Sequence, residues 1–401
     1  MKVSIIGMGY VGLNLAMAIP SEIEVIGFDI KRQLIQNLLQ GKSHIEGISD
    51  ELLAKKIKEN SFHPTFVAEE IADSDIVIIA VPTPLDSEKE PDLTYLQSAC
   101  ETIAINVARD VLVVNESTSF PGTLRDFIKP QIEEKCHSSV KFEFAVSPER
   151  VDPGNKEWNL FNTPRLISGL TEAATQKAML FYGAFCSEII EVSSPEVAES
   201  AKLFENTFRQ VNIALVNEFA QIAHALGISV YEVLDAANTK PYGFMKFRPS
   251  AGVGGHCIPV DPTYLSSTAE KVGVPAKFIN LANKTNLDMG NYIVSRIQAS
   301  QGPNLEMKRI QVIGVAYKPD VADTRETPAA IIVDSLRKLG AVVSWHDPLV
   351  GEWRNESSSE LGFSDIAVVV TKHSSTSSES ILSSAVYVFD TTGHVVGAET
   401  L

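Results

Sequence analysis

A glycine-rich stretch beyond the middle of the chain holds the residues suited to the most demanding chemistry. It runs from Gly252 to Pro262, and three glycines precede Cys257, with Asp261 four residues later. Glycines let the backbone pass close to a ligand and present the thiol on a short turn. A thiolate is a strong nucleophile where its surroundings lower the thiol pKa. The spacing is equally compatible with a buried cysteine beside a tight turn, so both interpretations stay open.

Lys202 and Asn206 lie four residues apart in a long helical pattern and therefore share one face of the predicted helix. A lysine and an asparagine on the polar side of a helix are usually solvated. Taken by itself, the pattern predicts a solvent-exposed face rather than a site.

A glycine turn near the N-terminus predicts a nucleotide site. It fits G-x-G-x-x-G, follows an apolar run and opens a helical stretch, and these glycines serve a tight turn, close approach to a pyrophosphate and helix–strand packing. Asp29, about 20 residues on, would bond the ribose hydroxyls and repel a 2′-phosphate, so NAD is favoured over NADP. A turn kept only for packing is the alternative, but strand, helix and acid together favour the dinucleotide. The turn residues are Gly7, Gly9, Tyr10, Val11 and Gly12.

Two further turns follow apolar strands at their carboxyl ends, the edge where open parallel sheets bind ligands. They are the Val81–Pro84 turn and the Glu116–Thr118 turn. Both could be ordinary turn chemistry. Their shared edge favours a role for Thr83 and Thr118 in holding cofactor or substrate.

The pattern of apolar and helical segments that must position these residues predicts an α/β fold. It consists of two Rossmann-like doubly wound domains joined by a helical middle. Short apolar runs alternate with helical segments, which is typical of a parallel sheet covered on both faces. The expected domains are residues 1–194, 195–300 and 301–401. The predicted strands are Val3–Ile6, Glu24–Phe28, Ile76–Val81, Val111–Val114, Phe142–Val146, Arg309–Val315, Val342–Trp345, Ile366–Val370 and Val386–Phe389.

One long helix is expected from Pro195 to Gly227, because proline suits a helix start and glycine a helix end. About 30 residues would extend about 45 Å. Apolar residues recur on one stripe of it, which could bury a homodimer interface or pack within one subunit. The stripe comprises Phe204, Phe208, Val211, Leu215, Phe219, Ile222 and Leu226.

Composition narrows the class of protein. The 401 residues carry a formal net charge of −16, which argues against nucleic acid and anionic membranes as partners. No apolar run approaches the roughly 20 residues of a membrane helix, and the N-terminus does not resemble a signal peptide, so a cytoplasmic protein is expected. The four cysteines lack zinc or C-x-x-C spacing, which predicts free thiols and no metal site.

Taken in order, the motifs resemble those of the UDP-glucose/GDP-mannose dehydrogenase family over essentially the whole chain. They are the N-terminal glycine turn, Val81-Pro82-Thr83-Pro84, Ser117-Thr118, Ser147-Pro148-Glu149-Arg150, Lys202 with Asn206, Gly254-Gly255-His256-Cys257 with Asp261, and Ala316-Tyr317-Lys318-Pro319-Asp320 leading to Asp323 and Arg325.

The resemblance implies a four-electron oxidation of C6 of a nucleotide sugar to the carboxylate, with NAD as cofactor, in polysaccharide biosynthesis. Cys257 would attack the C6 aldehyde, and the resulting thiohemiacetal would become a thioester that water hydrolyses. Lys202 and Asn206 would stabilise charge that develops on oxygen. Proton transfer would fall to Glu149, Asp261 and Thr118, with a water in the relay.

The resemblance also assigns the three parts of the chain: residues 1–194 bind NAD, 195–300 carry the catalytic loop and 301–401 bind the UDP-sugar. Arg325 lies at the mouth of the last part, where the family binds the nucleotide diphosphate, and is expected to contact the cofactor. Arginine suits phosphate because it pairs bidentately. Expected substrate contacts are Glu149, Arg150, Lys202, Asn206, Arg248, Gly254 and Lys318.

Two departures bear on the substrate. Val260 stands where enzymes acting on UDP-glucose usually have a lysine, and the Arg150–Asn155 segment looks like the branch acting on UDP-N-acetylhexosamines. The expected substrate is therefore UDP-N-acetylglucosamine or UDP-N-acetylmannosamine. The alternatives are UDP-glucose, a two-electron dehydrogenase of related fold that needs no thiol, and a non-catalytic NAD-responsive protein, which would not need these residues together.

Overall fold

The structure is a computed structural model that describes residues 1–45, 47–136, 139–152, 155 and 157–401. The chain forms two compact units. The first unit contains Met1–Glu205 and Ser267–Val272, and the second contains Asn206–Ser266 and Gly273–Leu401.

The first unit is built on an eight-stranded sheet in the order β3-β2-β1-β4-β5-β6-β7-β8. The strands from β3 to β6 in this order pair in parallel, as the sequence predicts, whereas β7 runs antiparallel to β6. The sequence did not predict β3, β7 or β8. The strands are β1 (Lys2–Ile6), β2 (Glu24–Phe28), β3 (Phe62–Thr65), β4 (Ile76–Ile79), β5 (Val111–Asn115), β6 (Phe142–Val146), β7 (Arg165–Gly169) and β8 (Ile189–Glu191).

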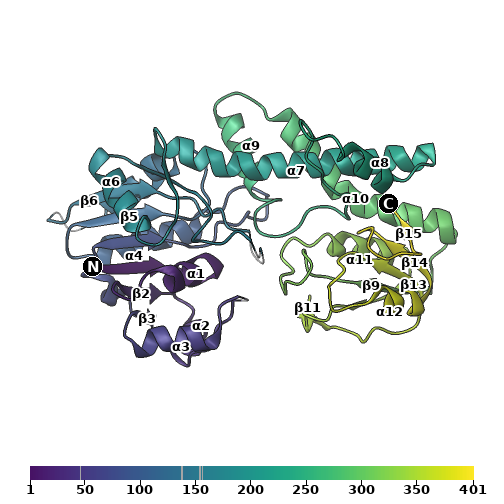
Figure 1. Cartoon of the computed structure of the whole chain (residues 1–401), viewed down its shortest axis with the longest axis horizontal. Coiled ribbons are helices and arrows are strands. Elements are labelled where there is room, and N and C mark those ends of the chain that lie inside the picture. Colours follow the sequence, from purple (N-terminus) through teal and green to yellow (C-terminus); the bar gives the residue numbers. More distant parts are fainter. Residues whose placement is uncertain (46, 137–138, 153–154, 156) are drawn as a thin grey trace. The chain divides into compact units, whose positions relative to one another are not determined.

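Helices cover both faces of this sheet, which confirms the doubly wound class (Figure 1). Successive residues of β4 alternate between two buried clusters: Ile76 and Ile78 pack with α1, and Val77 and Ile79 pack with α4. The helices are α1 (Tyr10–Ala18), α2 (Arg32–Leu39), α3 (Asp50–Lys58), α4 (Thr94–Asn106), α5 (Lys129–Glu133) and α6 (Glu172–Tyr182), with short turns η1 (Ala68–Ile71) and η2 (Leu124–Ile128).

The second unit holds a five-stranded parallel sheet in the order β10-β9-β13-β14-β15. The remaining strands are β9 (Arg309–Ile313), β10 (Val342–His346), β11 (Glu352–Trp353), β12 (Glu356–Ser357), β13 (Ser364–Val369), β14 (Ala385–Asp390) and β15 (Glu399–Thr400). The remaining helices are α8 (Val230–Ala237), α9 (Asp261–Lys271), α10 (Lys277–Gln301), α11 (Ala329–Lys338) and α12 (Ser378–Ser383).

The long helix α7 extends without interruption over Pro195–Leu226, close to the predicted bounds (Figure 1). Gly227 follows it with a φ of +70°, the left-handed conformation that favours glycine after a helix. Much of the predicted apolar stripe is solvent-exposed in the single chain, so it is not core within one subunit. The exposed members are Phe204, Phe208, Leu215, Ile222 and Leu226.

Candidate functional site

The glycine turn has the geometry that its sequence predicts. Gly7 has a φ of +101°, and its N–H donates to the carbonyl of Phe28 at 2.8 Å. A Cβ on Gly12 would lie 1.9 Å from the Gly7 carbonyl oxygen, so only glycine lets helix α1 pack this closely on the turn. A Cβ on Gly9 would meet nothing within 4 Å, so the backbone there is open to a ligand.

Asp29 lies directly beside this turn, one residue after β2. One carboxylate oxygen accepts the N–H of Met8 at 2.9 Å, and the other accepts the N–H of Lys31 at 2.8 Å. Each ionised oxygen can accept a further hydrogen bond. The carboxylate is therefore fixed next to the glycines, where a ribose hydroxyl could reach it.

The two turns at the carboxyl ends of β4 and β5 contact each other. Ser117 Oγ donates to the carbonyl of Val81 at 2.8 Å. Thr83 and Thr118 on these turns are both buried. The structure thus brings both predicted threonines to one edge of the sheet, the edge that also carries the glycine turn.

Glu149 is held at the same edge by an arginine that the sequence analysis missed. Its Oε2 pairs with Arg165 Nη2 at 2.6 Å, and its Oε1 accepts the backbone N–H groups of Arg150 and Val151, both at 2.7 Å. Glu149 is 9% exposed. Both of its oxygens are therefore engaged, while a small part of the side chain stays accessible.

Arg165 lies between Glu149 and a second carboxylate, Glu116. Arg165 Nη1 donates to Glu116 Oε1 at 2.9 Å and to Ser147 Oγ at 3.0 Å, and the Tyr182 hydroxyl donates to Glu116 Oε1 at 2.5 Å. Burial raises the pKa of the Glu116 carboxyl, and the charge of Arg165 opposes that rise. No sequence motif indicates Arg165 or Tyr182.

Arg150 forms an ion pair at the surface of the same unit. Its guanidinium bonds both carboxylate oxygens of Glu205, at 2.5 and 3.1 Å, and the carbonyl of Pro164 at 2.8 Å. Pro153 and Gly154, which belong to the segment that indicated an N-acetylhexosamine substrate, lie outside the described residues.

Lys202 and Asn206 do not lie on a solvated face, as the helical pattern alone predicts. Lys202 is 8% exposed, and Asn206 is half-buried. In the second unit, Asn206 Nδ2 donates to Asp261 Oδ2 at 2.6 Å, and Asp261 is completely buried. Two residues 55 positions apart are thus joined, as a shared site requires.

The Cys257 turn is tied to the backbone of Asp261. The Cys257 carbonyl accepts the N–H groups of Val260 and Asp261, so the thiol-bearing residue begins the first turn leading into α9. The thiol is half-buried, 4.0 Å from Nδ1 of His256. No disulfide joins the four cysteines, all of which lie in the described part of the chain.

The glycines before Cys257 pack on a second loop of the same unit. The N–H of Gly255 donates to the carbonyl of Arg325 at 2.8 Å, and a Cβ on Gly254 would lie 2.8 Å from Cβ of Tyr317. Asp323 forms an ion pair with the Arg325 guanidinium at 2.6 Å. Burial alone would raise the pKa of Asp323, but hydrogen bonds from Arg325 outweigh it and lower that pKa. The predicted residues Cys257, Gly254, Lys318 and Arg325 thus belong to two touching loops.

The sheet of the second unit repeats the arrangement seen at Gly7 and Asp29. Gly314 follows β9 with a φ of +83°, and Asp347 after β10 accepts the N–H groups of Val315 and Ala316. His373 bonds Asp347 through Nε2 at 3.1 Å and accepts the N–H of Asp320 at Nδ1, 2.9 Å away. These bonds fix the turn that carries Lys318.

Arg248 lies near the same unit's sheet through an aromatic contact. Its guanidinium carbon is 5.9 Å from the centre of the Tyr231 ring, a cation–π distance. A Cβ on Gly393 would lie 2.4 Å from Tyr231, so the loop after β14 packs directly on that ring.

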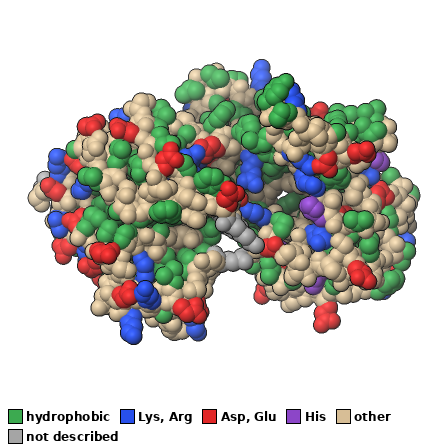
Figure 2. Space-filling view, in the orientation of Figure 1, with side chains coloured by type: hydrophobic (Ala, Val, Ile, Leu, Met, Phe, Trp, Pro, Cys, Tyr) green, Lys and Arg blue, Asp and Glu red, His purple; other side chains and the backbone are tan. Residues whose placement is uncertain are grey.

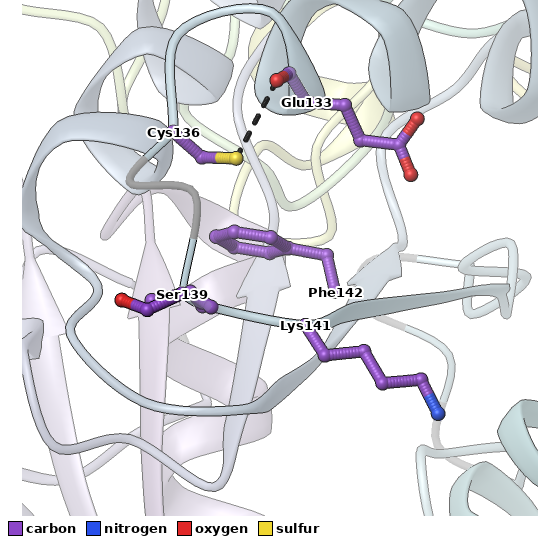
Figure 3. A pocket seen from close by; sticks show the side chains of 6 residues that line it. Glu133, Cys136, Ser139, Lys141 and Phe142 are labelled. Carbon is purple, nitrogen blue, oxygen red and sulfur yellow. Dashed lines mark hydrogen bonds between the residues drawn. The ribbon is translucent and has the colours of Figure 1, made fainter.

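A separate cavity of about 400 Å³ lies at the opposite edge of the first sheet (Figure 3). Its lining includes Phe142, the first residue of β6, whereas ligands of open α/β sheets bind at the carboxyl ends of strands. Cys136 Sγ donates to the carbonyl of Glu133 beside it. We assign this cavity no part in the site.

The described residues include no group of three or more His, Cys, Asp or Glu side chains placed to hold a metal ion. Within the same residues, none of the helices has the length and apolarity needed to cross a membrane. Acidic and basic side chains are interspersed on the face drawn in Figure 2.

Comparison with known proteins was made for the whole chain. Models of the UDP-glucose/GDP-mannose dehydrogenase family match it as an NAD binding domain over residues 1–185, a central domain over 196–288 and a UDP binding domain over 311–396. The chain is 38% identical over 359 residues to UDP-N-acetyl-D-glucosamine 6-dehydrogenase of Pseudomonas aeruginosa, covering 87% of this chain and 83% of that protein. It is 36% identical over 382 residues to UDP-N-acetyl-D-mannosamine dehydrogenase of Pyrococcus horikoshii, covering 93% and 90%.

Solved structures give the same result. A UDP-D-ManNAc dehydrogenase from Pyrococcus horikoshii superposes with a TM-score of 0.89 at 33% identity, covering 100% of this chain and 98% of that one. A UDP-glucose dehydrogenase from Pyrobaculum islandicum superposes with a TM-score of 0.91 at 26% identity, covering 100% and 96%. The predicted resemblance and the NAD cofactor are confirmed: the chain belongs to the UDP-glucose/GDP-mannose dehydrogenase family and is an NAD-dependent oxidoreductase.

Proposed function

We propose that this enzyme oxidises C6 of a UDP-N-acetylhexosamine, UDP-N-acetylglucosamine or UDP-N-acetylmannosamine, to the uronic acid through a covalent intermediate on Cys257. The observation that carries the proposal lies within one unit: Cys257 begins the turn that ends at Asp261, whose backbone N–H donates to the Cys257 carbonyl at 2.9 Å, and the Asp261 carboxylate accepts from Asn206 Nδ2 at 2.6 Å. A two-electron dehydrogenase would not need a thiol at that point.

The glycine turn and Asp29 are the residues that would hold NAD. The open backbone at Gly9 suits a pyrophosphate, the helix N-terminus favours its charge, and the fixed carboxylate suits a ribose diol. Tyr10, Val11, Thr83 and Thr118 complete the predicted contacts in this unit, and Arg325 is the predicted contact from the other. Bound NAD supplies the hydride acceptor for both oxidation steps.

Cys257 forms the covalent bond that keeps the half-oxidised sugar on the enzyme. Its sulfur adds to the C6 aldehyde to give a thiohemiacetal, and oxidation of that carbon gives a thioester. Water then cleaves the carbon–sulfur bond, releasing the carboxylate and regenerating the thiol. A cation such as Lys202 stabilises oxygen charge in these steps, and Asn206 would orient the same oxygen.

The carboxylates would move the protons. Asp261 is completely buried and holds Asn206, so it can both orient that amide and exchange a proton nearby. Glu149 and Thr118 lie at the ligand edge of the first sheet and would share the water that hydrolyses the thioester. Arg150, Arg248, Gly254 and Lys318 are the proposed contacts to the sugar and diphosphate.

Two observations support an N-acetylated sugar. Two relatives, 38% and 36% identical to this chain, are named as dehydrogenases of UDP-N-acetyl-D-glucosamine and UDP-N-acetyl-D-mannosamine. Val260 is apolar and buried at the position where enzymes acting on UDP-glucose are expected to have a lysine.

We also keep as predictions the three-part division at residues 194/195 and 300/301, a cytoplasmic location, and the absence of nucleic acid and membrane partners.

A substrate screen tests the proposal. NADH formation is measured with UDP-glucose, UDP-N-acetylglucosamine, UDP-N-acetylmannosamine and GDP-mannose, before and after alkylation of thiols. We expect turnover with an N-acetylhexosamine and its loss on alkylation of wild type. Cys257→Ser supplies the control, since it should fail without any reagent. Full activity with a blocked Cys257 would instead favour the two-electron dehydrogenase.

A further inference from the structure

The guanidinium of Arg165 lies between two carboxylates that come from neighbouring strands of the first unit. Glu116 follows β5, Glu149 follows β6, and Arg165 begins β7, which runs antiparallel to β6. All three side chains are at most 9% exposed. The reversed direction of β7 brings its first residue to the edge where the parallel strands end.

The contacts divide the guanidinium between the two acids. Nη1 and Nη2 both reach Glu116, at 2.9 and 3.3 Å, and Nη2 also reaches Glu149 at 2.6 Å. The Tyr182 ring lies against the guanidinium, with its centre 4.7 Å from the central carbon, and its hydroxyl bonds Glu116. Arg165 therefore has a single orientation, which these contacts define.

We propose that Arg165 is a positioning residue that holds the Glu149 carboxylate in one orientation at the ligand edge of the sheet, while Glu116 fixes Arg165. The proposal rests on the proposed function of Glu149. It goes further by naming the residues that orient Glu149.

The hydrogen bonds of Glu149 support this assignment. Glu149 accepts three of them, two from backbone N–H groups and one from the Arg165 guanidinium, so both of its oxygens are held. One guanidinium serves two buried carboxylates, so Glu116 opposes part of the stabilisation that Arg165 gives Glu149. Among the described residues, other ionisable groups around the cluster include Tyr182 and Cys186 near Arg165, and the Arg150–Glu205 pair beside Glu149.

A pair of variants separates this role from a purely structural one. Arg165→Met alone would leave Glu116 as an uncompensated buried charge and could unfold the protein. In Glu116→Gln, Arg165 still pairs with Glu149. The double variant Glu116→Gln/Arg165→Met removes the Arg165 cation and the Glu116 carboxylate together. The kcat should fall about tenfold or more from Glu116→Gln to the double variant with little change in KM, because Glu149 loses the contact that orients it.

A matched control comes from Arg337, which forms a two-pronged but exposed ion pair with Glu356 at 2.7 and 2.9 Å. Arg337→Met should leave kcat unchanged. Arg165→Lys with Glu116→Gln keeps a cation that can donate to Glu149 and should lose less kcat than the double variant. Equal kcat in Glu116→Gln and the double variant would overturn the proposal.

A second readout does not depend on turnover. The ¹³C carboxyl signal of Glu149, assigned by its loss in Glu149→Gln, is compared at one pH in the same two variants by NMR. Its chemical shift should differ between them, because the double variant lacks the hydrogen bond from Arg165. If no UDP-sugar is oxidised but this difference appears, the proposed function fails and the role of Arg165 stands; turnover without the difference gives the reverse result.

Discussion

Glu199 allows the effect of burying a carboxyl group on stability to be measured, because its pKa lies near neutral pH. It lies in the first turns of α7 and is 1% exposed. Its carboxylate accepts the N–H groups of Gly122 and Leu124 at 2.7 and 3.0 Å, and so ties the loop after Thr118 to the helix that carries Lys202. Burial raises the pKa of Glu199 from 4.5 to about 7, although these hydrogen bonds oppose the rise.

The direction of the pH dependence follows from proton binding. Between pH 4.5 and 7 the folded protein holds a proton on Glu199 that the unfolded chain has released. The stabilisation that protonated Glu199 gives the folded protein is therefore fully present below pH 4.5 and is lost as pH rises through about 7. From pH 5 to pH 8 the loss is about 2–3 kcal/mol, since one pKa unit corresponds to about 1.4 kcal/mol.

The perturbation is Glu199→Gln, and the assay is urea unfolding at pH 5, 6, 7 and 8, followed by far-ultraviolet circular dichroism. Glutamine cannot accept from both backbone N–H groups, which costs about 1–3 kcal/mol at every pH. The difference in free energy of unfolding between wild type and Glu199→Gln should then fall by about 2–3 kcal/mol from pH 5 to pH 8. The matched control is Glu196→Gln, because the pKa of Glu196, lowered to about 2 chiefly by its hydrogen bond from Arg125, lies below this range. If this difference in free energy of unfolding stays constant or grows with pH, the reasoning is refuted.

Two further predictions concern the cofactor turn and the long helix. Gly12→Ala would place a methyl group 1.9 Å from the Gly7 carbonyl oxygen. The dissociation constant of NAD, measured by calorimetry, should therefore rise by about tenfold or more. Unchanged affinity would contradict the packing role of this glycine. We also propose that the exposed stripe of α7 buries a homodimer interface, so Leu215→Arg, at a side chain that is 65% exposed, should give the monomer mass in light scattering where the wild type gives the dimer mass; a wild type of monomer mass would contradict it.

Local patterns predicted much of this fold. The glycine turn, the strands β1, β2, β5 and β6, and both ends of α7 follow from short-range sequence signals, because a tight turn, a strand period and a helix stop are each specified by a few neighbouring residues. Strand β7 could not be predicted as antiparallel, since direction within a sheet depends on the path of the chain between strands.

The site was predicted only where motifs mark it. Arg165 follows an ordinary proline at the start of a strand, and its two acidic partners lie 49 and 16 positions away in the sequence. Nothing local indicates that pairing. Lys202 likewise reads as a solvated helix residue, and only packing of the folded chain buries it. Burial and long-range pairing are properties of the tertiary structure, which spacing along the chain does not encode residue by residue.

The most direct test of the central claim is the number of NADH molecules formed per sugar when the UDP-N-acetylhexosamine is limiting and NAD is in excess. A covalent intermediate on Cys257 predicts two NADH and one uronic acid for each sugar, with no free aldehyde. One NADH per sugar, with the aldehyde released by the wild-type enzyme, would contradict the account.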